Sequence, residues 1–392
     1  MAKGKNKENK GTVASRIDKS IKQLKDNDFT LYFFVVDCKG IPNSSIGYIY
    51  ELAKTLYNQG FNVKMIYQLA DEYTKPELYK LRKQGSVPEP SKQFVGVKDW
   101  LGNEYASLPH LNIATQEWSV SPSDFLFIPE ALSSLMFETY KHKLPCKRYV
   151  ILQNYNYVSE FIPLGVEWKN YGIFDAIAIS DSQANKIKEV FPYMRTSILP
   201  PVVNDVFRKP IKPKKLVVNI ITKDPNDVNR VIKPFYWKYP MYKFISFREL
   251  RNIPREQYAD YLKEGIATVW VDRDTSFGYA PLEAMRCDNI VIGKIPEDMP
   301  EWMYDEEGII NNALWVYNIN DIPDVLAKAV GSWMRDEIPS ELLDEMGKTN
   351  QKYHFEEWDK NVERIFEGFV EERIQSFEEI KNNIAKNEGN NE

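Results

Sequence analysis

The chain lacks the features that mark membrane-spanning, secreted and disulfide-bonded proteins. It contains no run of about 18 apolar residues, and its first residues are rich in lysine and asparagine, so we expect neither a membrane span nor a secretory signal. Its three cysteines, Cys38, Cys146 and Cys287, are odd in number and far apart, which predicts a reducing compartment. These absences favour a cytoplasmic protein, in the cytoplasm of a host cell if a phage encodes the chain.

Residue patterns for metal and phosphate-loop chemistry are also scarce. The three histidines, His110, His142 and His354, lack the spacing of a metal site or of a nucleophile relay. No Gly-x4-Gly-Lys-Ser/Thr segment occurs, which disfavours an ATPase of the phosphate-loop type. The formal net charge of −5 argues against a surface that coats nucleic acid, although it leaves room for a local basic cleft.

The length and composition that remain predict two packed domains. A chain of 392 residues exceeds what one hydrophobic core usually serves. Hydrophobic residues make up 43% of the chain and aromatic residues 13%, which is ample for two cores. Apolar runs at residues 31–37, 61–66, 124–130, 148–154 and 174–180 alternate with helical patterns, as in a parallel sheet covered by helices.

The first 28 residues form a segment with a basic bias. Ile17, Ile21 and Leu24 recur at helical spacing among lysines, which predicts a short amphipathic helix. Such a helix can dock on the rest of the protein, or it can make a peripheral contact with an anionic membrane or with nucleic acid. We favour a solvated tail followed by a docked helix.

The most informative segment runs from Asp274 to Met285. A β-branched and aromatic strand at 267–271 leads through Gly278 to a helix that we expect to begin near Pro281, with Glu283 in its first turn. Glycine lets a backbone approach a ligand closely, and the amides at the start of a helix receive phosphate groups. Together these features predict a sugar-nucleotide site.

This segment resembles the Glu-x7-Glu signature of retaining, nucleotide-sugar-dependent glycosyltransferases of the family-4 type. Phe277, Gly278 and the run from Pro281 to Met285 match the signature, whereas Thr275 and Ser276 stand where the family has its first Glu and first Gly. The resemblance implies an α/β protein of the GT-B fold, with two Rossmann-like domains whose parallel sheets face an interdomain cleft. It also implies that the nucleoside-diphosphate sugar is a substrate and that no cofactor is needed. We expect donor binding to need no metal ion, on the ground that no Asp-x-Asp pair stands near a strand end.

The resemblance assigns roles to individual residues in the second half of the chain. The second Glu of the family holds the donor ribose, which gives that role to Glu283. Phe277 and Gly278 are further candidates for binding the nucleotide sugar. The first Glu of the family touches the transferred sugar, so Thr275 inherits that position, and Asp274 is the carboxylate that can substitute. These two residues and Lys223 are the catalytic candidates, because the resemblance places Lys223 on the donor diphosphate. Arg230 inherits the companion cation of that diphosphate clamp.

The resemblance also assigns the acceptor side of the cleft. Ser45 and Gly47 stand in the loop that lies beneath the donor diphosphate in the family. Gln153 and Asn154 stand at a strand end where many relatives have a histidine, and amides there can hydrogen-bond a sugar but cannot carry a proton.

Domain boundaries follow from the linker and from the terminal patterns. We expect a basic tail and helix at 1–28, an acceptor domain at 29–208 and a nucleotide-sugar domain at 209–350. Residues 208–215 are rich in proline and charge, as in a linker. In the last region, 351–392, two amphipathic stretches, 356–366 and 370–384, should cross back to the first domain before a solvated tail at 386–392.

We therefore expect a hexosyltransferase-like enzyme that moves a sugar from a nucleoside diphosphate to an acceptor. The resemblance implies a glycan as the acceptor and retention of configuration. Two alternatives stay open at this point. The lysine-, asparagine- and tyrosine-rich composition also suits a DNA-modifying glycosyltransferase of phage type. The missing first Glu suits a silent sugar-nucleotide or glycan-binding module.

Overall fold

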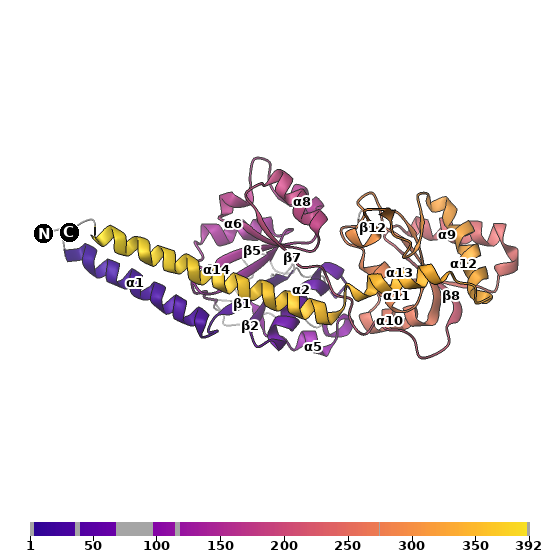
Figure 1. The fold of residues 1–392 in the computed structure, drawn as a ribbon, viewed down its shortest axis with the longest axis horizontal. Helices are drawn as coiled ribbons and strands as arrows, with labels where there is room; N and C mark the ends of the chain where they lie inside the picture. The colour runs from indigo at the N-terminus through magenta and orange to yellow at the C-terminus, as the bar shows by residue number, and fades with distance from the viewer. Residues whose placement is uncertain (1–3, 36–39, 68–96, 114–117, 274, 390–392) are drawn as a thin grey trace, which may run out of the picture.

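The computed structural model describes residues 4–35, 40–67, 97–113, 118–273 and 275–389. Figure 1 shows two α/β lobes side by side, each with a central sheet between helices. All strand pairs within the two large sheets are parallel, and a small antiparallel pair, β12 (Tyr304–Asp305) with β13 (Gly308–Ile309), lies in the second lobe. The predicted α/β class with two parallel sheets is confirmed.

The first lobe contains a seven-stranded sheet of order β3-β2-β1-β4-β5-β6-β7. The strands are β1 (Thr30–Val35), β2 (Asn62–Tyr67), β3 (His110–Asn112), β4 (Phe125–Pro129), β5 (Lys147–Leu152), β6 (Asp175–Ala178) and β7 (Arg195–Ile198). Register is set by pairs such as Phe33 with Met65 on one side of β1 and Phe33 with Phe127 on the other. The strand order reverses between β1 and β4, and open α/β sheets bind ligands at such a switch point.

The second lobe contains a five-stranded sheet of order β14-β11-β10-β8-β9. Its strands are β8 (Lys215–Thr222), β9 (Ser246–Glu249), β10 (Gly265–Val271), β11 (Ile290–Lys294) and β14 (Leu314–Val316). The order of the strands reverses between β8 and β10, so this sheet has a switch point of its own.

Helices cover both faces of the two sheets. Those of the first lobe are α2 (Ser44–Asn58), α5 (Asn103–Ala106), α6 (Ser133–Lys141), α7 (Tyr155–Phe161), η1 (Trp168–Tyr171) and α8 (Asp181–Val190). Those of the second are α9 (Pro225–Lys238), η2 (Pro240–Tyr242), α10 (Arg255–Glu264), α11 (Tyr279–Arg286), η3 (Glu301–Met303), η4 (Ile319–Asp321), α12 (Ile322–Met334) and α13 (Ser340–Gln351). Because helices cover both faces of the sheet, strands such as β1 are buried at every position rather than at alternate ones.

Stacked aromatic rings form the centre of the first lobe. The ring of Phe127 lies 4.7 Å from that of Phe33 and 5.2 Å from that of Tyr149, measured between centroids. Phe366 and Phe369 cover this stack from outside, with Phe366 at 5.2 Å from Phe127 and Phe369 at 4.3 Å from Tyr149. Both come from α14 (Phe355–Gly389), so the end of the chain completes the core of the first lobe.

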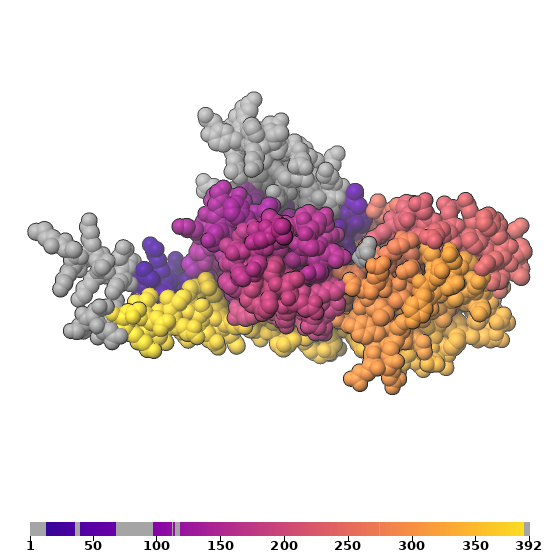
Figure 2. Space-filling view, turned by 90° about the horizontal axis from the view of Figure 1, so that it is seen from above, coloured from indigo at the N-terminus to yellow at the C-terminus, as the bar shows by residue number. Residues whose placement is uncertain are grey.

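Helix α14 crosses from the second lobe along the first and then runs beyond it (Figures 1 and 2). It is one continuous helix where the sequence predicted two stretches and a solvated tail from 386, because the residues that follow Phe366 continue its apolar stripe through Phe369 and Phe377. Near its start, the indole nitrogen of Trp358 donates to the Thr55 hydroxyl at 2.8 Å. The predicted crossing back to the first lobe is therefore present.

The first helix, α1 (Gly4–Lys25), lies beside the distal part of α14, and the two chain ends meet at the same end of the molecule (Figure 1). Ile17 and Leu24 are buried, and Lys381 pairs with Asp18 at 2.6 Å. The basic segment is therefore a helix docked on α14, and its contact with a membrane or with nucleic acid stays a prediction. Within the described residues, no helix is both long and apolar enough to cross a membrane.

The two lobes are joined at two chain crossings. One follows β7 and the other follows α13, and they meet where the Val203 amide donates to the Tyr353 carbonyl at 3.0 Å. Lys214, in the predicted linker, contacts the second lobe: its ammonium donates to the carbonyls of Gly265 at 2.7 Å and Cys287 at 2.8 Å. The end of this connection is thereby attached to the second lobe.

Removal of the Phe366 ring tests the role of α14. Phe366 is 1% exposed, and Phe366→Ala should lower the free energy of unfolding by about 3–5 kcal/mol, since it leaves a cavity against Phe127. Ile380→Ala, on the same helix but 44% exposed, is the matched control and should cost far less. Denaturant unfolding of both variants measures the difference. Equal losses would show that α14 does not complete the core.

Candidate functional site

A cavity of about 500 Å³ lies between the two lobes and is lined by both. The first lobe contributes the loop after β1, the start of α2 and the residues after β5. The second contributes the ends of β8 and β10 and the starts of α10 and α11. In parallel sheets these are all carboxyl-terminal edges, so the cavity occupies the place where such sheets bind ligands.

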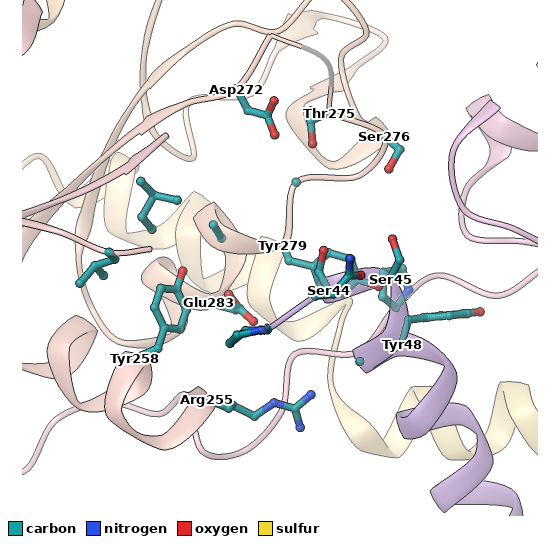
Figure 3. A pocket seen from close by; sticks show the side chains of 18 of the residues that line it. Ser44, Ser45, Tyr48, Arg255, Tyr258, Asp272, Thr275, Ser276, Tyr279 and Glu283 are labelled. Carbon is teal, nitrogen blue, oxygen red and sulfur yellow. The ribbon is translucent and has the colours of Figure 1, made fainter. Parts of the chain in front are cut away.

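The wall on the side of the first lobe is polar and begins with α2. Ser44 and Ser45 open this helix and line the cavity (Figure 3). The Asn43 side chain caps the helix by accepting from the Ile46 amide at 3.1 Å, which leaves the serine hydroxyls available to the cavity. Gly47 lies one turn on, and a Cβ there would meet the Arg255 guanidinium at 3.5 Å. Ser45 and Gly47 therefore line the cavity, but from the first residues of α2 and not from the preceding loop in which they were expected.

Gln153 and Asn154 line the same wall, where β5 ends and α7 begins. The Asn154 side chain caps α7 by accepting from the Asn156 amide at 3.0 Å. Below it, the Glu130 carboxylate accepts from the Asn154 backbone amide at 2.8 Å and fixes this turn. Glu130 is 2% exposed, and burial raises the pKa of its carboxyl to about 7 in spite of the amides that it accepts from.

Across the cavity, Gly278 controls the start of α11. It adopts a left-handed conformation with φ of 75°, and a Cβ there would come within 3.3 Å of the rings of Trp270 and Trp302. Helix α11 begins at Tyr279, two residues before the predicted start, because a proline third in the helix is tolerated. The expectation that Glu283 lies in the first turn was therefore wrong; it lies in the second, and the N-cap residue of α11, Gly278, has no side chain that could cap the amides at the start of this helix.

The remaining residues of the motif take different positions. Thr275 lines the cavity and is buried. Phe277 lies behind the lining: its ring packs against Tyr279 and Tyr353, and its carbonyl accepts from the Trp302 indole at 2.6 Å. Phe277 therefore supports the motif from the core. The catalytic candidate Asp274 lies outside the described residues.

Glu283 lies in the wall of the cavity, between Tyr258 and Arg255 (Figure 3). Burial raises the pKa of its carboxyl to about 7, although the positive charge of Arg255 and a hydrogen bond donated by Tyr258 both oppose the rise. The carboxylate of Glu283 faces the cavity and accepts one hydrogen bond, from Tyr258. It can accept further hydrogen bonds from the hydroxyl groups of a ligand.

Arg255 links Glu283 to the first lobe. Its guanidinium donates to the Glu51 carboxylate at 3.1 Å and to the Tyr105 hydroxyl at 2.9 Å. The side chains of Arg255 and Glu51 are 17% and 8% exposed, so this ion pair is largely shielded from water. Tyr105 and Asn204 also donate to Glu51, at 2.8 and 3.3 Å. Burial lowers the pKa of Arg255, but Glu51, Tyr105 and Glu283 together raise it above its ordinary value.

Two cations line the cavity near the end of β8. Lys223 directly follows this strand and pairs with Asp272, which follows β10, at 3.0 Å. Arg251, from the loop after β9, donates to the Thr222 carbonyl at 3.4 Å. Arg230 does not line the cavity: α9 begins at Pro225, so Arg230 lies in its second turn, where it pairs with Asp227 at 3.5 Å.

Comparison with known proteins relates this architecture to solved structures. No protein-family profile and no curated protein matches the sequence. The pneumococcal O-GlcNAc transferase GtfA, in complex with UDP and GlcNAc, matches with a TM-score of 0.56 at 9% identity, over 88% of this chain and 99% of that one. Sucrose-phosphate synthase from Thermosynechococcus elongatus matches with a TM-score of 0.53 at 11% identity, over 87% and 99%. Anabaena HepE, in complex with UDP-glucose, matches with a TM-score of 0.53 at 10% identity, over 86% and 99%.

The fold is GT-B. The two sheets of the chain correspond to the paired Rossmann-like sheets of this fold, and the cavity lies between them. At identities of 9–11% the likeness extends to the fold and not to individual residues.

Several residues of the GT-B cleft were missed by the sequence reasoning. These residues line the cavity but belong to no recognisable sequence motif; they are Tyr48, Asn204, Arg251, Arg255 and Tyr258. Only their position after strands, or at the start of a helix, could have signalled them. The spacing Asp272-Arg273-Asp274 was also overlooked. It is an Asp-x-Asp pair after β10, so the stated ground for expecting no metal ion was wrong. Among the described residues, which do not include Asp274, no cluster of three His, Cys, Asp or Glu side chains could hold a metal ion.

The buried pair between the lobes makes a first prediction for this site. Arg255→Met should lower the free energy of unfolding by about 3–5 kcal/mol, because Glu51 stays buried without its cation. Adding Glu51→Gln should restore part of the loss, since glutamine keeps an acceptor for Tyr105 without the charge. Lys238→Met, which breaks the exposed pair with Asp324, should cost at most about 1 kcal/mol. Denaturant unfolding measures all three, and a loss as small in Arg255→Met as in the control would contradict the assignment.

Glu130 makes a prediction about pH. Because its pKa is raised in the folded state, the unfolded chain releases this proton at lower pH, and folding stability falls as pH rises from about 4.5 to about 7. Glu130→Gln has no such loss. Its stability relative to the parent should therefore rise by up to about 3 kcal/mol between pH 5 and pH 8. Unfolding measured at both pH values tests this, and a difference that does not change with pH would show that Glu130 ionises normally.

Proposed function

We propose that the protein is a nucleotide-sugar-dependent glycosyltransferase, hexosyltransferase-like in its chemistry. The observation that carries the proposal is the convergence, at one sheet edge, of the Glu283 carboxylate, the start of α11 behind Gly278 and the cations Lys223 and Arg251. A carboxylate that accepts hydroxyls, beside amides and cations that attract phosphate, suits the ribose and diphosphate of a nucleotide. The GT-B likeness and the partial Glu-x7-Glu motif support the same assignment.

In this proposal the donor binds to the second lobe. Glu283 accepts hydrogen bonds from the ribose hydroxyls, and Tyr258 and Arg255 hold its carboxylate in place. Lys223 and Arg251 neutralise the diphosphate, which competes with Asp272 for Lys223. Gly278 keeps the start of α11 free of a side chain, so that the amides there face the same phosphates. Donors of this kind stabilise the charge that develops as the diphosphate departs.

The transferred sugar and the acceptor then face the polar wall of the first lobe. Ser45, Gln153 and Asn154 offer hydroxyl and amide groups that hydrogen-bond sugars, and Thr275 offers a hydroxyl from the opposite side. We propose a glycan acceptor and retention of configuration: the acceptor hydroxyl approaches on the face from which the diphosphate leaves, and the diphosphate helps to take its proton. This route requires no protein nucleophile.

The proposal predicts that a nucleoside diphosphate stabilises the protein. Saturating UDP or GDP should raise the melting temperature, whereas free glucose at the same concentration should not, because ribose and diphosphate contacts dominate the site. The shift should persist in EDTA, since in this proposal the side chains of Lys223 and Arg251, and not a metal ion, neutralise the diphosphate. Abolition by EDTA would assign a metal to the site, and no shift with either nucleotide would refute nucleotide binding.

Glu283→Gln separates the ribose role from a structural one. The change replaces one acceptor oxygen by a donor and removes a charge-assisted hydrogen bond worth roughly 1.5–3 kcal/mol. Nucleotide affinity should fall about tenfold to a hundredfold. Glu256→Gln, an exposed change on α10, is the control and should leave affinity unchanged. A Glu283→Gln protein that melts earlier yet binds nucleotide as the parent does would make Glu283 a structural residue.

A further inference from the structure

An exposed apolar strip leads out of the cavity along α7. Tyr157, in the first turn of this helix, lines the cavity, and the centroid of the Phe161 ring lies 5.8 Å from that of the Tyr157 ring. Residues four apart share a helix face, so Phe161 continues the face of Tyr157 by one turn, or about 5.4 Å. Leu164, in the loop after the helix, is fully exposed. We name Tyr157, Phe161 and Leu164 the apolar strip.

The other side chains of α7 show that the strip is a distinct face. Val158 points into the core of the first lobe and is buried, whereas Ser159 and Glu160 are exposed polar residues. Phe161 nevertheless keeps 43% of its surface exposed. A single exposed apolar residue needs no explanation, but three in succession beginning at a cavity mark a binding surface.

A second loop adds apolar surface beside the lining. Pro42 lines the cavity, and the preceding residue, Ile41, is 51% exposed. Inside the cavity, by contrast, the same lobe presents hydroxyl and amide groups from Ser44, Ser45 and Asn154. The first lobe thus offers a polar pocket that opens onto apolar surface, which suits a molecule with a sugar at one end and an apolar group at the other.

We propose that the apolar strip is an acceptor subsite that takes an alkyl chain attached to the acceptor sugar. This inference rests on the proposed function, which places the acceptor against the first lobe. The strip runs at least one helical turn out of the cavity, so a chain can cover Tyr157 and Phe161 together while its sugar stays among the polar groups. A single aromatic ring offers less apolar area to the strip than such a chain does.

Two glycosides with the same sugar test the subsite. The full-length protein is titrated calorimetrically with methyl β-D-glucoside and with n-octyl β-D-glucoside, the latter below its micelle-forming concentration. The octyl compound should bind at least about tenfold more tightly, because burial of each methylene is favourable. Phenyl β-D-glucoside distinguishes a ring from a chain and should bind between the two. Octyl binding no tighter than methyl binding overturns the subsite, and phenyl binding as tight as octyl binding overturns the alkyl assignment.

Variants locate the effect on the strip. Phe161→Ser combined with Leu164→Ser should bind the octyl and methyl compounds within about threefold of each other. Leu164→Ser alone, at a fully exposed position where folding is not at risk, should already reduce the octyl preference about threefold. Phe174→Ser is the matched control, since Phe174 is 42% exposed and lies away from the lining, and it should keep the full preference. Retention of the preference in the double variant, or its loss in the control, overturns the assignment to the strip.

The nucleotide measurement separates failure of the subsite from failure of the proposed function. A protein that is stabilised by UDP or GDP but binds both glycosides alike retains its donor site and lacks the alkyl subsite. A protein that binds neither nucleotide contradicts the glycosyltransferase proposal, and with it the acceptor role of the strip.

Discussion

The buried ion pair between Arg255 of α10 and Glu51 of α2 is the contact on which the arrangement of the site depends. Both charges are shielded from water, and Tyr105 and Asn204 complete the hydrogen bonds of the carboxylate. A buried charge without its partner is costly. Movements of one lobe against the other that would separate Arg255 from Glu51 while both stay buried are therefore disfavoured. The pair thereby orients the two carboxyl-terminal sheet edges toward one cavity.

The same arginine connects the contact between the lobes with the donor side of the cavity. Arg255 opposes the rise in the pKa of Glu283, while its hydrogen bonds hold it to Glu51 and Tyr105. The ionisation of Glu283 therefore depends on a residue whose own position is set by the other lobe. A second contact, the Glu301 carboxylate accepting from the Asp181 amide at 2.9 Å, caps α8 across the same boundary.

Much of the fold could be predicted from local pattern. Continuous apolar runs identified strands buried on both faces, and the segment 267–285 identified a strand, a glycine turn and a helix. The boundaries were less certain: proline tolerated inside the first turn moved the start of α11 to Tyr279, and continued packing made α14 one helix. Of the site, Ser45, Gly47, Gln153, Asn154, Lys223, Thr275, Gly278 and Glu283 line the cavity, whereas Phe277 and Arg230 do not.

The sequence by itself determined the secondary structure and which segments end at the ligand-binding edge of a sheet, because strand burial, helix caps and glycine turns depend on neighbouring residues. Only the tertiary structure decided which side chains meet. Glu51 and Arg255 are 204 residues apart, and no local pattern marks either one as half of a buried pair. The raised pKa of Glu283 likewise depends on burial by residues from several elements, since desolvation is set by what surrounds a group and not by the residues beside it in the chain.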